Sequence, residues 1–140
     1  MDAAAETLSL LGLRMKSPKR PSLSALRKAV ERGLPPESLQ FLKLHFPSET
    51  SHGPTLTLLS VEGPAPRKRL SPEESAQLAR LAYVLAVAHE VWGNWDGAVA
   101  FLEKPHPGLE GISPWAAAET EWGAREVEAI LRKIQFGLPA

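Results

Sequence analysis

The sequence predicts an all-α protein, and three observations lead to this fold class. Apolar residues recur every three or four positions over several stretches, which is the spacing of one face of a helix. Ser, Thr or Asn stands before most of these stretches, and Gly or Pro follows them, as at helix ends. Prolines interrupt the least regular segment, residues 47–69, which can supply one short extended piece at most. We therefore expect helices joined by short loops, without a sheet.

The longest helix is predicted for residues 70–93, LSPEESAQLARLAYVLAVAHEVWG. Ser71 and Glu74 have the spacing of a capping box, in which each side chain accepts a hydrogen bond from the other residue's backbone N–H. Pro72 suits the first helical position, and Gly93 suits the left-handed conformation that ends a helix. Start, body and end all agree, and we expect the rest of the chain to be organised around this helix.

Both sides of this helix are apolar in its second half. A helix that is apolar all round must be covered all round. Two covers fit the sequence: a core made by the chain itself, or a seam with a partner or a second copy. We expect a homodimer, and the residues of the dimer or core seam are Leu81, Tyr83, Val84, Val87, Val91 and Trp92.

Two shorter helices are predicted before the long one. Residues 1–21 form an amino-terminal segment that ends in a basic, proline-containing linker. The first helix covers residues 22–32, with Ser22 as its cap and Gly33 at its end. A second helix covers residues 37–46 and is stopped by a proline.

Three helical stretches are predicted after the long helix. Asn94 can cap a helix over residues 95–104, Ser113 a single turn, and Thr120 a last helix that runs to Ile134. The last helix has one apolar stripe, and its other side is charged. Oppositely charged residues stand four positions apart on that side, in the pairs Glu121 with Arg125 and Glu128 with Arg132.

The chain continues as QFGLPA, where Gly137 and Pro139 stop the helix. Phe136 and Leu138 are therefore apolar side chains in a tail with little of its own to pack against. Such a tail either frays or occupies a groove on another molecule.

The zero net charge hides an asymmetry between the two halves. Residues 1–70 hold 11 Lys and Arg against 6 Asp and Glu, whereas residues 71–140 hold 5 against 10. A basic half favours nucleic acid as a partner, although surface charge without a ligand gives the same count. The candidate DNA-binding residues are Lys19, Arg20, Arg67, Lys68 and Arg69.

Several classes of function are disfavoured. The chain has no cysteine, so thiolate metal sites and cysteine nucleophiles are excluded. The four histidines lie in four different elements or loops, and no phosphate-binding loop, nucleophile elbow or dinucleotide fingerprint is present. We expect no enzyme, no metal and no cofactor. Without a basic leader or an apolar run of about twenty residues, we also expect no membrane contact and a cytoplasmic protein.

Half of the chain carries a series of motifs in a fixed order. These are R-L-SPEES at Arg69–Ser75, W-G at Trp92–Gly93, A-x-x-F-L-x-x-P-x-P-x-L-x-G at Ala98–Gly111, S-P at Ser113–Pro114, T-E-x-G-A-x-x-V at Thr120–Val127, and the I-x-x-G-x-P-A ending. With these motifs, residues 70–140 resemble the toxin-binding domain of the Xre/MbcA/ParS antitoxin family. LLGL at Leu10–Leu13 and the region from Leu26 to Leu39 resemble the start of such antitoxins less distinctively.

The resemblance implies an antitoxin that neutralises a toxin by covering the toxin's active site. In that family the toxin is often a RES-domain enzyme that destroys NAD, and the first half of the antitoxin is an Xre-type helix-turn-helix used for dimerisation and operator binding. The resemblance therefore also implies autorepression. The implied toxin-binding residues are Trp122, Arg125, Ile134, Gln135, Phe136, Gly137, Leu138, Pro139 and Ala140.

The chain departs from the family pattern where the helices of the reading motif should stand. Pro54, Pro64 and Pro66 fall there, and a proline inside a helix costs about 3 kcal/mol. We therefore expect a degenerate helix-turn-helix over residues 22–69, followed by the toxin-binding domain over residues 70–140. The alternative is a helix-turn-helix transcriptional regulator without a toxin partner.

Overall fold

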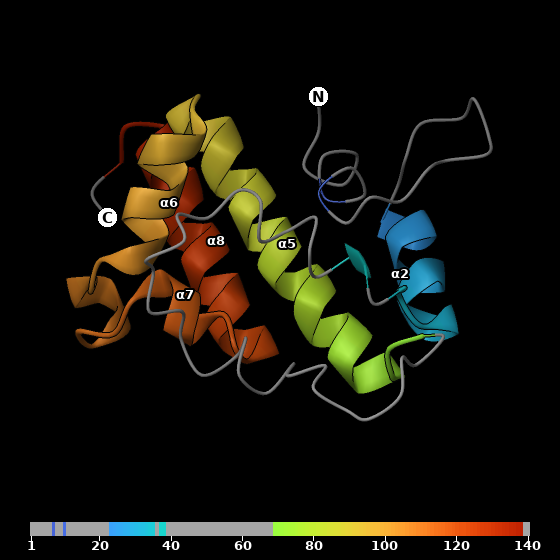
Figure 1. The fold of residues 1–140 in the computed structure, drawn as a ribbon. Helices are drawn as coiled ribbons and strands as arrows, with labels where there is room; N and C mark the ends of the chain where they lie inside the picture. Colours follow the sequence, from blue (N-terminus) through green and yellow to red (C-terminus); the bar gives the residue numbers. More distant parts are fainter. Residues whose placement is uncertain (1–6, 8–9, 11–22, 36, 39–68, 139–140) are drawn as a thin grey trace.

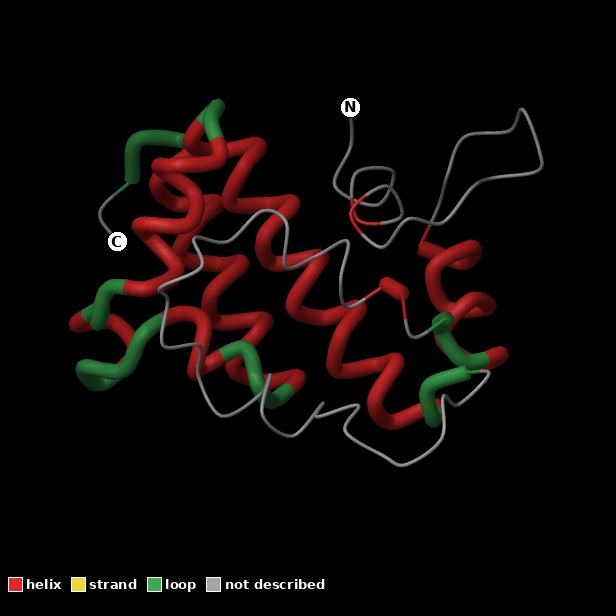
Figure 2. Tube along the Cα trace, in the orientation of Figure 1, coloured by secondary structure: helices red, strands yellow, loops and turns green. Residues whose placement is uncertain are grey.

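The structure is a computed structural model that describes residues 7, 10, 23–35, 37–38 and 69–138. Within these ranges every regular element is helical, as Figure 2 shows, which confirms the all-α prediction for this part of the chain. The elements in order are α2 (Leu23–Arg32), α5 (Pro72–Trp92), α6 (Trp95–Glu103), the short 3₁₀ helix η1 (Pro107–Leu109), α7 (Pro114–Ala117) and α8 (Glu121–Gln135).

Helix α5 is the centre of the fold. Helix α2 packs on one side of it, and α6 and α8 pack on the other (Figure 1). The short α7 packs against α6 and α8. The ends of α5 match the sequence prediction. Ser71 and Glu74 form the reciprocal capping box, and Gly93 has φ of 78° and donates its N–H to the His89 carbonyl.

The middle of α5 is covered by the chain itself. Leu81, Val84 and Val87 are at most 1% exposed. The sequence predicted these residues at a dimer or core seam. The protein's own core buries all three, so no dimer is needed to cover them. Of the other seam residues, Tyr83 and Val91 are half-buried and Trp92 is 42% exposed.

The junction between α2 and α5 joins two segments that are far apart in sequence. Gly33 ends α2 in the left-handed conformation, as predicted, with φ of 89°. A β-carbon at Gly33 would overlap the Leu70 carbonyl oxygen, so only glycine fits this close approach. The backbone N–H of Leu70 donates to the Leu34 carbonyl oxygen at 2.8 Å. The start of α5 is thus fastened to the end of α2.

The predicted starts of the last three helices are confirmed. Asn94, Ser113 and Thr120 each accept, through a side-chain oxygen, the backbone N–H three residues later, at 2.6, 3.1 and 3.0 Å. The turn η1 lies between the helix predicted over residues 95–104 and the single turn predicted at Ser113. The His106 ring nitrogen Nδ1 accepts the Gly108 N–H at 2.9 Å and so begins it. Helix α8 extends one residue beyond its expected end.

The remaining predictions fall mostly outside the described residues. These are the linker within 1–21, the helix over 37–46 apart from its first two residues, and the segment 47–68. The helix-turn-helix and the division into 1–21, 22–69 and 70–140 therefore stay predictions. None of the helices described is both long enough and apolar enough to span a membrane.

Candidate functional site

Helix α8 has two unlike faces. Its buried face packs into the core through Gly123, Ala124, Val127, Ile130 and Leu131. The opposite face, called the outward stripe below, consists of Trp122, Glu126, Ala129, Lys133 and Phe136, which recur every three or four residues and are all exposed. A helix rises about 1.5 Å per residue, so the two aromatic rings lie about 21 Å apart along it. The fold therefore presents a long, mixed surface with one aromatic ring at each end.

The aromatic ends of the outward stripe are the most exposed large apolar residues in the described structure. Trp122 is 75% exposed and Phe136 is 71% exposed. At the Trp122 end, the Arg125 guanidinium lies 5.4 Å from the centre of the indole ring. Arg125 also forms the predicted ion pair with Glu121, at 3.0 Å. Trp122 therefore lies beside a cation, a contact that contributes about 0.5–1 kcal/mol at an exposed site.

The chain after α8 turns in a fixed way. Leu138 donates its backbone N–H to the Lys133 carbonyl at 2.8 Å, and Gly137 donates to the Ile134 carbonyl at 3.1 Å. With Gly137 at φ of 69°, this is the hydrogen-bond pattern of a Schellman motif. Leu138 is 57% exposed beside Phe136. The predicted apolar tail is thus ordered as far as Leu138, with both side chains toward solvent, while Pro139 and Ala140 lie outside the described residues.

Steric overlap explains why the T-E-x-G-A motif has a glycine at position 123. A β-carbon at Gly123 would overlap the carbonyl oxygen of Ala117, at the end of α7. The glycine therefore lets the first turn of α8 lie directly against α7. Its backbone N–H is also the group that donates to the capping side chain of Thr120. This contact fixes the direction in which α8 leaves α7, and so the direction of the outward stripe.

A polar network ties α8 to α5. The Tyr83 hydroxyl donates to Glu128 Oε2 at 2.7 Å. Arg132 lies 3.9 Å from the same carboxylate oxygen, which is the second predicted pair, and 3.4 Å from Glu90 Oε1 on α5. Burial raises the pKa of Tyr83 to about 12, and the hydrogen bond and negative charge of Glu128 add to the rise. The sequence predicted Glu128 on the charged side of the last helix. The packing of α8 on α5 brings Tyr83 to Glu128, and this contact could not be predicted from the sequence.

Of the five predicted DNA-binding residues, Arg69 lies within the described residues. The Arg69 guanidinium donates from Nη1 to the Gly33 carbonyl oxygen at 2.9 Å, so it supports the carboxyl end of α2. Lys19, Arg20, Arg67 and Lys68 lie outside the described residues.

His89 on α5 stacks on the Trp95 ring of α6 with 3.7 Å between the ring centres. Among the described side chains, no three His, Asp or Glu groups converge as metal ligands would. The outward stripe is thus an exposed surface with an aromatic side chain at each end.

Comparison with known proteins identifies the carboxy-terminal half. Residues 87–137 match the antitoxin Xre/MbcA/ParS C-terminal toxin-binding domain. An "Antitoxin Xre" of Yersinia enterocolitica is 35% identical over 71 residues, which are 50% of this chain and 48% of that protein. An "Antitoxin Xre" of Pseudomonas putida is 34% identical over 68 residues, 49% of this chain and 43% of that protein. No solved structure matches.

The chain thus matches a little under half the length of these two relatives. The matched residues contain the end of α5, from Val87 to Trp92, and all of the outward stripe. In its carboxy-terminal half, the chain is similar to the Xre/MbcA/ParS antitoxin family.

Proposed function

We propose that this protein is an antitoxin that binds its cognate toxin through the outward stripe and the turn after α8. The observation that supports this most strongly is the exposure of Trp122 and Phe136 inside residues 87–137, which match a toxin-binding domain, with the exposed Leu138 directly after them. The contact set also includes Arg125, Ile134, Gln135, Gly137, Pro139 and Ala140. The protein acts by binding rather than by catalysis, and it works in the cytoplasm.

The geometry suits a tight interface. Large aromatic side chains and Arg supply most of the binding energy in protein interfaces, and the outward stripe offers Trp122 and Phe136 with Arg125 beside the former. The residues are held by a capped helix and a Schellman turn, so little conformational entropy is lost when a partner binds. Ile134 differs from the other residues of this set, because its side chain is half-buried and packs against the core. It therefore supports the turn from the side of the core.

The proposed partner is a RES-domain toxin that degrades NAD, neutralised when α8 and the following turn cover its active site. This choice rests on the family resemblance. The test is co-expression with the neighbouring reading frame. That frame alone should arrest growth and lower cellular NAD, and this protein should restore both and co-purify with its product.

Paired variants make the test specific to the outward stripe. Trp122→Ala and Phe136→Ala should abolish rescue and co-purification without unfolding the protein. Glu110→Ala, which changes an exposed residue outside α8, is the matched control and should rescue fully. A neighbouring frame that is harmless alone and does not co-purify would rule the proposal out.

Autorepression is the second part of the proposal. The basic first half, as a homodimer, would bind the operator of its own operon with the residues Lys19, Arg20, Arg67, Lys68 and Arg69. The excess of positive charge in residues 1–70 supports it. Binding of the promoter fragment that weakens steeply with salt is expected; no shift even at low salt would rule it out. Promoter binding without any toxin partner would favour the alternative, a DNA-binding regulator.

A further inference from the structure

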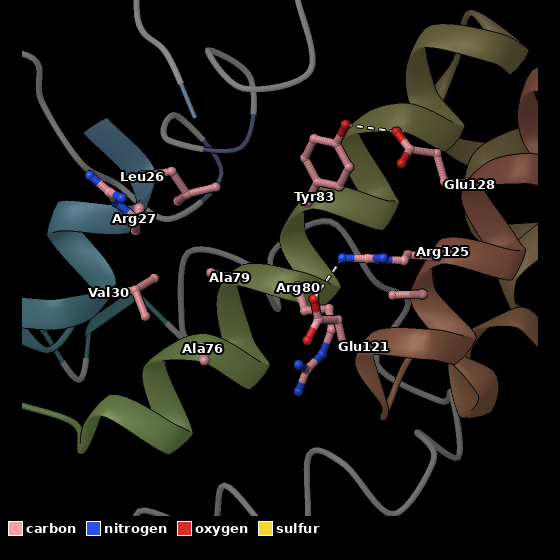
Figure 3. Close-up of a pocket in the computed structure, with 11 residues that line it drawn as sticks. Leu26, Arg27, Val30, Ala76, Ala79, Arg80, Tyr83, Glu121, Arg125 and Glu128 are labelled. Atoms are coloured by element: carbon pink, nitrogen blue, oxygen red, sulfur yellow. Dashed lines mark hydrogen bonds and ion pairs between the residues drawn. The ribbon is translucent and has the colours of Figure 1, made fainter. Parts of the chain in front are cut away.

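A groove of about 450 Å³ lies between α2 and α8, with α5 as its floor (Figure 3). Its lining is mainly apolar: Leu26 and Val30 from α2, Ala76, Ala79 and Tyr83 from α5, and Ala124 from α8. Ala76 and Ala79 of α5 have small side chains, so they do not fill the space between α2 and α8. The groove is on a different side of α8 from the outward stripe, and Arg125 lies at the border of the two.

The charges around the groove do not balance. Both carboxylates at its edge already have partners within the chain, since Glu121 pairs with Arg125 and Glu128 with Tyr83 and Arg132. Two arginines are left. Arg27 makes only an exposed 3.9 Å pair with Glu31, and such pairs are weak.

Arg80 is the second of these arginines, and it lies on α5. Its Nη2 donates to the Glu119 carbonyl at 3.3 Å, and its Nε is buried without a hydrogen-bond acceptor. Among the described residues, no carboxylate forms an ion pair with Arg80. The groove is therefore apolar along its floor and positive at its edge.

We propose that this groove binds an acidic amphipathic helix of the toxin, as a second contact besides the outward stripe. Apolar side chains at helical spacing would fill the space above Ala76 and Ala79, and carboxylates on the flank of that helix would reach Arg27 and Arg80. The choice of an acidic partner follows from charge complementarity. The proposal rests on the proposed function, because the helix belongs to the toxin, and it adds α2 to the surface that grips it.

The test uses the full chain and the purified product of the neighbouring reading frame, with the dissociation constant measured at two salt concentrations. Arg27→Glu reverses a charge at the groove edge, and Lys28→Glu makes the same change at the next exposed position of α2, away from the groove. Ala76→Phe fills the groove from its floor. Circular dichroism and urea unfolding establish that each variant is folded.

Arg27→Glu and Ala76→Phe should weaken binding about tenfold or more, which is the scale of a lost close charge pair at an interface. Lys28→Glu should bind like the wild type, and the salt dependence should shrink in Arg27→Glu alone. Wild-type affinity in both groove variants, with loss in Trp122→Ala, would overturn this inference and leave the proposed function standing. Groove variants that change only self-association would assign the groove to a second copy of the chain and also overturn it. If the wild-type protein does not bind at all, the proposed function itself fails.

Discussion

The backbone N–H of Leu34 donates a hydrogen bond to the Ser75 Oγ, 41 residues further along the chain, with 2.8 Å between the two atoms. Both residues are completely buried. Leu34 follows the end of α2, and its N–H turns away from that helix toward Ser75, which stands in the first turn of α5. The buried hydroxyl therefore satisfies a donor that water cannot reach, and it sets the position of α2 on α5.

Removing this hydroxyl should destabilise the protein. Ser75→Ala leaves the Leu34 N–H buried without an acceptor, which costs about 1–3 kcal/mol. Urea unfolding followed by circular dichroism should show that loss. Ser24→Ala, at an exposed position of α2, should change the free energy of unfolding by no more than about 0.5 kcal/mol. Equal stability of Ser75→Ala and the wild type would mean that the Leu34 N–H finds another partner.

The raised pKa of Tyr83 gives the stability a pH dependence at alkaline pH. The chain has one tyrosine, so tyrosinate absorbance reports this residue alone. Its folded pKa, about 12, is above the model value of 10.0, so folding favours the protonated phenol. The contribution is complete below pH 10.0 and is lost as the pH rises toward about 12.

We expect the tyrosinate midpoint near 12 in the folded protein and a lower one in Glu128→Gln, which removes a negative charge from beside the phenol. It should fall only in part, because burial is the largest cause of the rise. The stability difference between wild type and Tyr83→Phe should stay constant below pH 10.0 and shrink above it. A midpoint near 10.0 in the wild type would show that Tyr83 is solvated and does not bond Glu128.

Gly123→Ala should destabilise the protein although alanine is the better helix former. The added β-carbon would overlap the Ala117 carbonyl oxygen, so α7 or α8 must shift. Forcing extra volume into a packed contact costs about 1–3 kcal/mol. Thermal unfolding is the measurement.

The reverse exchange at an exposed position of α8 calibrates this result. Ala129→Gly should cost about 1 kcal/mol from helix propensity alone. A Gly123→Ala variant more stable than the wild type would mean that α8 does not lie against α7 as described.

The two faces of α8 should separate stability from binding. Leu131→Ala removes a completely buried side chain and should cost about 2–5 kcal/mol. Trp122→Ala and Phe136→Ala change exposed side chains and should keep the free energy of unfolding within about 0.5 kcal/mol. If either exposed variant unfolds as easily as Leu131→Ala, its ring packs on the protein itself and is not presented to a partner.

The sequence predicted most helix starts in the second half because capping is local. Ser71, Asn94, Ser113 and Thr120 each accept an N–H only three residues away, so residue type and spacing are enough to locate them. The same local rule predicted Gly33 and Gly93 as helix ends. The η1 turn was missed because its cap is a histidine, His106, which is not among the usual capping residues.

What covers each helix was decided by the tertiary structure. The sequence showed that α5 is apolar on all sides, but burial of Val84 and Val87 by the chain itself depends on where α6 and α8 pack. The Tyr83 to Glu128 bond, the placing of Arg69 on Gly33, and the groove over Ala76 and Ala79 likewise join residues far apart in the chain. The sequence by itself determined where helices begin and end, since those hydrogen bonds span one turn. Only the packing of helices against one another determined which surfaces were left for a partner.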